Sequence, residues 1–152
     1  MKPDEPHWQL YALVSGIYTK SRRLSEESLK PLGVTFPQFG TLYRLSFRDN
    51  ITQKELSEIM DTDTTTIMVI CDSLEKKGFL KRMKDPKDRR VNRLVLTNEG
   101  KKVISKAYPL MMKRYEFFTN SVTREELELI TPILRRLYIA IKNQHQKELE
   151  RS

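Results

Sequence analysis

The stretch DTTTIMVICDSLEKKGFLKRMKDPKDRRVNRLVLTNEG, residues 63–100, decides the fold that we predict for this chain. Its first part repeats apolar residues at helical spacing. Asp63 is a residue type that caps helix starts, and Gly78 is one that ends helices. The pattern therefore predicts a helix between these two residues.

Two strand-like segments follow this helix, residues 79–84 and 91–96. They are joined by the sequence Asp85-Pro86-Lys87-Asp88, in which proline suits the second position of a tight turn. We therefore expect a two-stranded β-hairpin, with Thr97 capping the helix that comes after it.

A short helix is predicted just before residue 63. Thr52 and Glu55 have the spacing of a capping box, in which each side chain accepts a hydrogen bond from a backbone amide at the helix start. Two short helices joined by a tight turn and followed by a hairpin make a winged helix-turn-helix. We place this lobe at residues 35–98, beginning with a helix that Thr35 caps.

Helices are also predicted on both sides of the lobe. Residues 8–29 carry apolar residues at helical spacing, and so does the segment after the capping box of Thr123 and Glu126. The predicted fold class is therefore mainly α with a small β-hairpin, a winged helix-turn-helix with flanking N- and C-terminal helices. These helices carry more apolar surface than a thin winged core can cover, which favours dimerisation.

The composition is that of a soluble protein with a polyanionic partner. The 152 residues suit one compact domain, and the formal net charge is +8. The first residues lack the apolar segment of a secretory signal, so we expect a cytoplasmic protein that is nucleoid-associated when bound to DNA. One cysteine and two distant histidines offer no metal site, and we expect no cofactor.

The positive charge is concentrated on the predicted hairpin. Residues 76–93 contain nine basic and two acidic residues, so a local excess of seven compares with +8 for the whole chain. A run of charge is often only a solvated face. A basic hairpin directly after a helix-turn-helix, however, indicates that the partner is double-stranded DNA.

The helix that starts at Asp63 is the expected reader of the DNA major groove. Its outward residues, with the basic residues of the hairpin, are the predicted DNA contacts: Thr62, Thr64, Thr65, Thr66, Met68, Val69, Lys84, Lys87, Arg89 and Arg90. Capping and turn chemistry is an alternative role for the threonines, above all for Thr66. Asp88 and Asp72 are predicted to brace the hairpin by fixing an arginine.

The motifs of this stretch resemble the MarR-type (multiple-antibiotic-resistance) family of transcriptional regulators. DPKDRRVNRLVLTNEG, residues 85–100, is similar to the family's wing signature, and CDSLEKKGFLKR, residues 71–82, to the segment before it. DTTTIMV, residues 63–69, is similar to the recognition helix of one branch. Lys87 stands where the family usually has arginine, and Val69 where other branches have a polar or basic residue.

The resemblance implies a single MarR-like domain over residues 1–152 that forms a homodimer, with residues 1–34 and 99–152 as dimerisation helices. It also implies a near-palindromic operator. Family members are commonly repressors, released when a small and often aromatic effector binds between these helices and the DNA-binding lobe. Candidate pocket residues are Trp8, Tyr11, Tyr18, Phe39, Tyr43 and Tyr115, although aromatics at helical spacing are more often part of a core.

Two other functions stay open on the sequence. A winged helix used as a protein-interaction module would have an apolar outward face, which Met68 and Val69 partly provide. A sequence-neutral architectural DNA binder would insert apolar wedges, and none is evident at the hairpin tip. An enzyme is not expected, because no phosphate-binding glycine loop, nucleophile–base pair or paired carboxylates are apparent. Cys71 falls at a core position of its helix.

Overall fold

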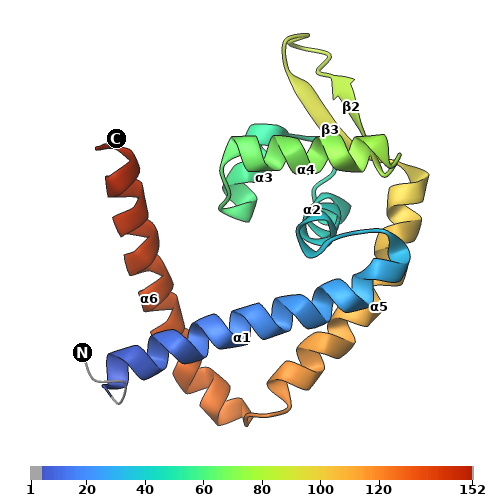
Figure 1. The fold of residues 1–152 in the computed structure, drawn as a ribbon. Helices are drawn as coiled ribbons and strands as arrows, with labels where there is room; N and C mark the ends of the chain where they lie inside the picture. The colour runs from blue at the N-terminus through green and yellow to red at the C-terminus, as the bar shows by residue number, and fades with distance from the viewer. Residues whose placement is uncertain (1–4, 152) are drawn as a thin grey trace. The chain divides into compact units, whose positions relative to one another are not determined.

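The computed structural model describes residues 5–151, so residues 1–4 and Ser152 of the expected 1–152 domain lie outside the described residues. The chain divides into two compact units within helix α5, one up to Arg114 and one from Tyr115 onward. In chain order the elements are α1 (Pro6–Leu29), the 3-10 turn η1 (Lys30–Leu32), α2 (Phe36–Phe47), β1 (Ile51–Thr52), α3 (Gln53–Met60), α4 (Thr64–Lys76), β2 (Leu80–Lys84), β3 (Asn92–Leu96), α5 (Asn98–Thr119) and α6 (Arg124–Leu149) (Figure 1). The predicted fold class is confirmed.

Short polar motifs fix where the helices begin. Three of the described helices start with a full capping box, in which each of two side chains accepts a hydrogen bond from the backbone amide of the other residue. The pairs are Thr35 with Gln38 for α2, Thr52 with Glu55 for α3, and Thr123 with Glu126 for α6. Each box satisfies two amides that have no partner inside the helix. The boxes predicted at Thr52 and Thr123 are therefore confirmed.

The sheet contains a strand that the sequence did not predict. Its order is β1-β3-β2, with both pairs antiparallel. β1 consists only of Ile51 and Thr52, which pair with Leu94 and Arg93 of β3. Two residues are too few to show the alternation that identifies a strand in a sequence. The expected two-stranded hairpin is therefore corrected to a three-stranded sheet, in which β1 ties the start of α3 to the hairpin.

The connection between β2 and β3 is longer than the predicted tight turn. Seven residues, 85–91, separate the two strands. The amide of Asp85 donates to the carbonyl of Val91 at 3.0 Å, and the Val91 amide donates to the carbonyl of Asp88 at 2.9 Å. The prediction of a tight turn around Pro86 was wrong, because these bonds close the strands across a wider loop. We call β2, this loop and β3 the wing.

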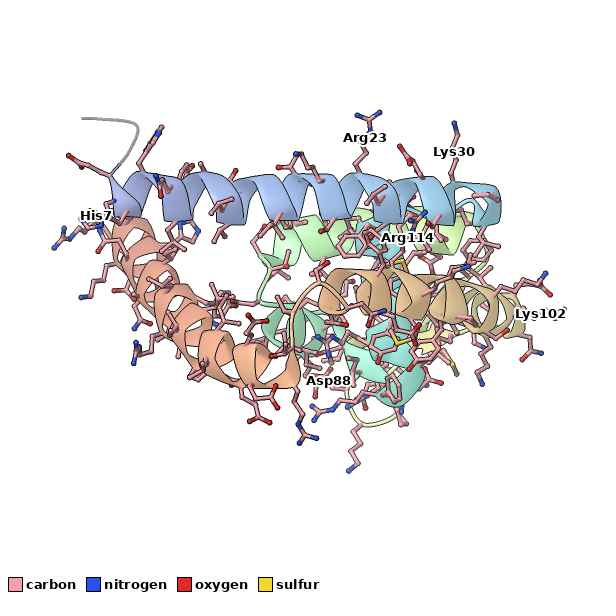
Figure 2. The ribbon with its side chains drawn as sticks, turned by 90° about the horizontal axis from the view of Figure 1, so that it is seen from below. His7, Arg23, Lys30, Asp88, Lys102 and Arg114 are labelled. Atoms are coloured by element: carbon pink, nitrogen blue, oxygen red, sulfur yellow. The ribbon has the colours of Figure 1, made fainter. Side chains whose placement is uncertain are left out.

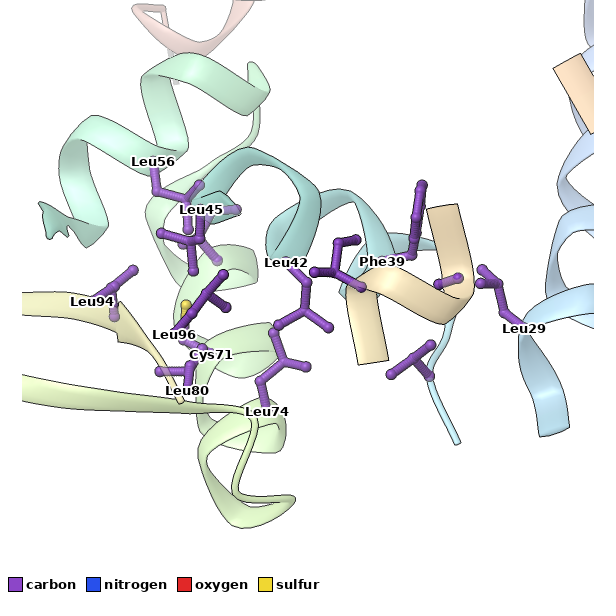
Figure 3. Close-up of a cluster of buried hydrophobic side chains, with 14 of the residues drawn as sticks. Leu29, Phe39, Leu42, Leu45, Leu56, Cys71, Leu74, Leu80, Leu94 and Leu96 are labelled. Atoms are coloured by element: carbon purple, nitrogen blue, oxygen red, sulfur yellow. The ribbon is translucent and has the colours of Figure 1, made fainter. Parts of the chain in front are cut away.

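The core of the first unit lies between its helices and the sheet (Figure 3). Fully buried apolar side chains come from every side of it: Leu29 of α1, Leu42 and Leu45 of α2, Leu56 of α3, Ile67, Cys71 and Leu74 of α4, Leu80 and Leu94 of the sheet, and Met111 of α5. Burying one leucine-sized side chain stabilises a fold by about 1.5–3 kcal/mol. This core holds α4 and the wing in a fixed relation, and so positions the surface that both present.

Helix α5 begins in close contact with the residues just before β2. The amide of Thr97 donates to the carbonyl of Phe79 at 3.1 Å, and its hydroxyl donates to the carbonyl of Gly78 at 2.6 Å. A Cβ placed on Gly100 would lie 2.0 Å from the Phe79 carbonyl oxygen. The first turn of α5 approaches the backbone of Phe79 this closely only because residue 100 has no side chain.

Two helices leave many apolar side chains exposed. On α1, in the first unit, these are Trp8, Leu10, Tyr11, Leu13, Val14, Ile17, Tyr18 and Leu24. On α6, in the second unit, they are Leu129, Ile130, Ile133, Leu134, Leu137, Tyr138, Ile139 and Ile141. Apolar surface of this extent usually marks an interface. None of the helices described in residues 5–151 is long and apolar enough to span a bilayer.

Candidate nucleic-acid interface

The first two turns of α4 present hydroxyl and apolar side chains to solvent. Thr64, Thr65, Met68 and Val69 are all exposed, with 46% of Met68 and 61% of Val69 accessible. Residues four apart share a helix face, so Thr64 lies beside Met68 and Thr65 beside Val69. The structure thus brings these four predicted contact residues together on one surface.

The two other predicted threonines use their hydroxyls within the chain. The hydroxyl of Thr66 donates to the carboxylate of Asp63 at 2.6 Å, and its amide donates to the same carboxylate at 2.8 Å. These two bonds also hold the pKa of Asp63 below its ordinary value. Thr62, which is half-buried, donates to the carbonyl of Met60 at 3.1 Å. The capping role foreseen for Thr66 is present, and a DNA contact by either threonine stays a prediction.

The wing carries the four predicted basic contacts. Lys84 ends β2, while Lys87, Arg89 and Arg90 lie on the loop, and all four side chains are exposed. The wing therefore offers several cations, at positions where their full charge faces solvent. Cations held this way attract phosphate groups and release bound counterions when they pair with them.

Asp88 holds one of these cations in place. Its carboxylate accepts hydrogen bonds from the amide of Arg90 at 3.0 Å and from two guanidinium nitrogens of the same residue, each at 3.2 Å. The bonds from Arg90 lower the pKa of Asp88. The arginine side chain is still 91% exposed, so the pair fixes its direction and leaves it open to a partner. Figure 2 marks Asp88 on the loop.

The residue that organises the loop is Asp85, for which the sequence predicted no such role. Only 5% of it is exposed. Its carboxylate accepts the amides of Lys87 at 2.7 Å and Asp88 at 3.4 Å, and also the guanidinium of Arg93. The bond from the Lys87 amide and the ion pair with Arg93 hold the pKa of Asp85 below its ordinary value. An Asp-Pro start often forms such side-chain turns, and this local signal was available in the sequence.

A second unpredicted residue, Arg82 of β2, joins the wing to the helices. Its guanidinium lies 2.6 Å from Asp72 and is also paired with Glu75, both on α4. It donates to the side chain of Gln53 on α3 at 3.2 Å. Asp72 was predicted as a brace on an arginine. The structure identifies that arginine as Arg82 and adds Glu75 to the cluster.

The candidate pocket aromatics fall into separate groups. Phe39 stacks on Tyr43, whose ring also stacks on that of Tyr108 with centroids 5.7 Å apart and planes inclined by 10°. Phe47 packs edge-on against Tyr43. Neither Tyr108 nor Phe47 was predicted: Tyr108 reaches Tyr43 only through the packing of α5 against α2, whereas Phe47 is four residues after Tyr43 on α2, a helical spacing that was available in the sequence.

The remaining candidates lie elsewhere. Trp8 and Tyr11 stack on each other at 5.8 Å near the start of α1, where they line a shallow open depression with Glu5 and His7. Tyr18 is exposed farther along α1, and Tyr115 belongs to the second unit. The structure thus brings Phe39 together with Tyr43, and Trp8 together with Tyr11. A pocket-lining role for any of the six stays a prediction.

The remaining candidate groups are a buried thiol and the acidic and histidine side chains. Cys71 is fully buried in the core, and burial raises the pKa of its thiol to about 11. In the part of the chain that the structure describes, no three His, Cys, Asp or Glu side chains are grouped to hold a metal ion. Arg23 of α1 and Lys30 of η1 point outward in Figure 2 and border an open depression, where Glu26 and Glu27 balance their charges.

The known proteins that this chain resembles are transcriptional regulators. The family model described as "MarR family" matches residues 34–91. The HTH-type transcriptional regulator YybA of Bacillus subtilis is 31% identical over 118 residues, which is 75% of this chain and 76% of YybA. Among solved structures, a mutant of Escherichia coli MarR complexed with operator DNA is 26% identical, with a TM-score of 0.78 over 85% of this chain and 93% of that one.

A more distant structure shares the fold. The organohalide-sensing regulator RdhR-CbdbA1625, in its 2,4-dichlorophenol-bound form, is 20% identical and has a TM-score of 0.83. The match covers 91% of this chain and 82% of that one. At this identity the likeness extends to the fold alone.

Proposed function

Because this chain belongs to the MarR family of DNA-binding transcriptional regulators, we propose that it is a sequence-specific repressor that binds a near-palindromic operator as a homodimer. Members of this family regulate transcription and are not enzymes. The observation that carries the proposal is the basic wing beside the exposed N-terminal face of α4. Together they offer one element for the major groove and one for the DNA backbone.

In the proposed complex, α4 enters the major groove with its N-terminal turns. The groove is about 12 Å wide, which admits a helix. Thr64, Thr65, Met68 and Val69 would then face the base edges, while Lys84, Lys87, Arg89 and Arg90 would follow the phosphates and the neighbouring minor groove. Asp85 and Arg82 would act indirectly, by holding the loop and the wing in place.

Homodimerisation is proposed from the exposed apolar faces of α1 and α6. Two copies would bury these faces against each other, with residues 1–34 and 99–152 as dimerisation helices and residues 35–98 as the DNA-binding lobe. Two lobes related by a two-fold axis would read half-sites about 34–36 Å apart, one helical turn of DNA. Such a regulator would act in the cytoplasm, at the nucleoid while it is bound.

We also propose that a small aromatic effector releases the repressor from its operator. The support is the Phe39–Tyr43–Tyr108 stack, whose outer ring is partly exposed and would accept another planar ring. RdhR-CbdbA1625, which has the same fold, has been solved with 2,4-dichlorophenol bound. We propose a phenol or an aromatic acid as the effector class.

The experiment that tests the function is selection of bound sequences from a random duplex pool, followed by affinity measurements over a salt series. We expect one enriched inverted repeat, bound more tightly than scrambled DNA by a factor of at least about 10³. Lys87→Ala should weaken binding, whereas Lys30→Ala, a lysine of η1 outside the wing, should not. Equal binding to all sequences would instead support an architectural protein, and no binding at low salt would support a protein-interaction module.

A further inference from the structure

The first two turns of α4 expose apolar side chains, and these suggest how the helix would recognise bases. We infer that α4 reads the C5-methyl groups of thymines in the operator half-site, through Met68 and Val69, and makes no bidentate hydrogen bonds to bases. The inference rests on the proposed function, since it concerns the same surface.

The side chains that α4 presents exclude the usual hydrogen-bond readers. Bidentate recognition requires Arg or Lys for guanine and Asn or Gln for adenine. From Thr64 to Glu75, α4 contains none of these four residue types. Its first basic residue, Lys76, lies at the helix end opposite to the exposed N-terminal turns. This part of the helix has no long donor side chain to place against a base.

The polar groups farther along α4 are already occupied. Asp72 is paired with Arg82 at 2.6 Å. The hydroxyl of Ser73 accepts the side-chain amide of Gln38 at 2.9 Å. Both carry their hydrogen bonds inside the protein, so a base contact by either would break a contact that holds the lobe together.

The neighbouring helix α3 does not supply the missing donors either. Gln53 is the first residue of α3. Its side-chain oxygen accepts a hydrogen bond from Arg82 at 3.2 Å, so the amide cannot make a bidentate contact with adenine. Lys54 is exposed but offers a single charged group, which suits a phosphate. The hydroxyl of Thr66 is bonded to Asp63, so base recognition in the major groove is left to four exposed residues of α4: Thr64, Thr65, Met68 and Val69.

Those four residues match the surface of thymine. Only thymine displays a methyl group in the major groove of unmodified DNA. The side chain of Val69 ends in two methyl groups, Met68 ends in a flexible thioether, and both threonines add a methyl. The i, i+4 pairs Thr64–Met68 and Thr65–Val69 each combine one apolar group with one hydroxyl. In the part of the chain described, the hydroxyls of Thr64 and Thr65 make no hydrogen bond to another side chain. They therefore remain available for a nearby base or phosphate.

The test replaces single thymines of the selected operator by deoxyuridine, which removes the methyl group and keeps the base pair. At the thymines that α4 contacts, we expect each replacement to weaken binding about fourfold, the effect of losing one buried methyl group. Val69→Ala should weaken binding to the thymine operator and abolish the further loss on deoxyuridine at one position. Met68→Ala should do the same at another. Both side chains are exposed, so neither variant is expected to disturb folding.

A control variant separates methyl recognition from general weakening. Arg89→Ala, on the wing, should lower affinity for both operators by the same factor and leave the deoxyuridine effect unchanged. The inference is overturned if the protein binds its operator specifically and no deoxyuridine replacement changes the affinity. It is also overturned if the loss persists in both α4 variants. In either case the proposed function stands, whereas failure to select any sequence would overturn both.

Discussion

Arg82 of β2 and Asp72 of α4 are joined by an ion pair of 2.6 Å between the guanidinium and the carboxylate. Glu75 and Gln53 complete the set of side chains around this arginine. One side chain thus connects the wing to both helices of the helix-turn-helix. The orientation of the wing relative to α3 and α4 is therefore set from within the lobe.

We expect Arg82→Met to destabilise the protein by about 1–2 kcal/mol, because the arginine is mostly buried and its removal leaves two carboxylates without their partner. The figure is modest because both carboxylates are partly exposed. Urea unfolding gives this value. The matched control is Arg90→Met, which removes an arginine that is 91% exposed and should leave stability nearly unchanged. Equal stability of Arg82→Met and wild type would show that the cluster is not a brace.

The stability of the folded protein should depend on pH through Asp85. Its pKa in the folded protein is lowered from the ordinary value of 3.8. A lowered pKa contributes stability that is fully present above the unfolded value and is lost as the pH falls through the folded value. Asp85→Asn should therefore have a lower Tm than wild type at pH 6, and the difference should narrow as the pH falls below about 4. Thermal unfolding monitored by circular dichroism gives the Tm of each protein at each pH.

The control for Asp85 is Glu128→Gln on α6. This glutamate pairs with Arg124 on an exposed surface, so its replacement should change the Tm little at any pH. A difference between Asp85→Asn and wild type that stays constant from pH 6 to pH 3 would contradict the stabilising role of the carboxylate charge.

The salt dependence of DNA binding should report each wing cation separately. Removing one phosphate contact lowers the slope of log K against log salt by about 0.9. Lys87→Ala and Arg89→Ala are each expected to do this, and Lys30→Ala to leave the slope unchanged. Fluorescence anisotropy on the selected operator provides the slopes. A loss of affinity with an unaltered slope would place the residue outside phosphate contact.

Cys71 is expected to be unreactive in the folded protein. Burial raises the pKa of its thiol to about 11, which lowers the thiolate fraction at pH 8 about a hundredfold relative to a free cysteine. Labelling with a disulfide reagent should therefore be slow in buffer and fast in urea, and mild oxidant should leave operator affinity unchanged. Rapid labelling in buffer, or oxidant-sensitive binding, would show that the thiol is accessible.

Leu13 tests dimerisation through α1. It is 63% exposed, and Leu13→Glu should place a charge in the proposed dimer interface without disturbing the core. Sedimentation velocity should give a dimer of the 18.0 kDa chain for wild type and a monomer for the variant. Phe47→Glu, an exposed apolar position on α2, serves as the control and should remain dimeric. A wild-type protein that sediments as a monomer would contradict the proposal directly.

The elements of the lobe could be predicted because each carries its own local signal. Asp63 and Gly78 mark the two ends of the segment that contains α4, and Thr52 with Glu55 marks the start of α3. These signals depend on hydrogen bonds between residues at most a few positions apart. Strand β1 has no such signal, because its two residues become a strand only by pairing with Leu94 and Arg93.

The residues of the candidate site also divide into those that could be predicted from the sequence and those that could not. The exposed positions of α4 follow from helical spacing, and the basic residues of the wing follow from composition. The braces follow only in part: Asp88 and Asp72 were predicted to fix an arginine, whereas the roles of Asp85 and Arg82 depend on loop geometry and on contacts across the fold. Asp88 was predicted from its neighbour Arg90, whereas Asp85 acquires its role by closing a loop onto Arg93. Arg82 becomes the centre of a cluster only when β2 lies against α4 and α3.

The contact at Gly100 closes the base of the wing. The chain leaves the helix-turn-helix at Gly78 and Phe79, and it returns at Thr97 and Gly100, where the outgoing and incoming segments are bonded to each other. A wing grafted onto another scaffold would therefore have to carry both segments together, with glycine at position 100. The loop of residues 85–91 lies at the opposite end of the hairpin. It could be exchanged or lengthened in an engineered regulator without changing the hydrogen bonds of Thr97 to Gly78 and Phe79.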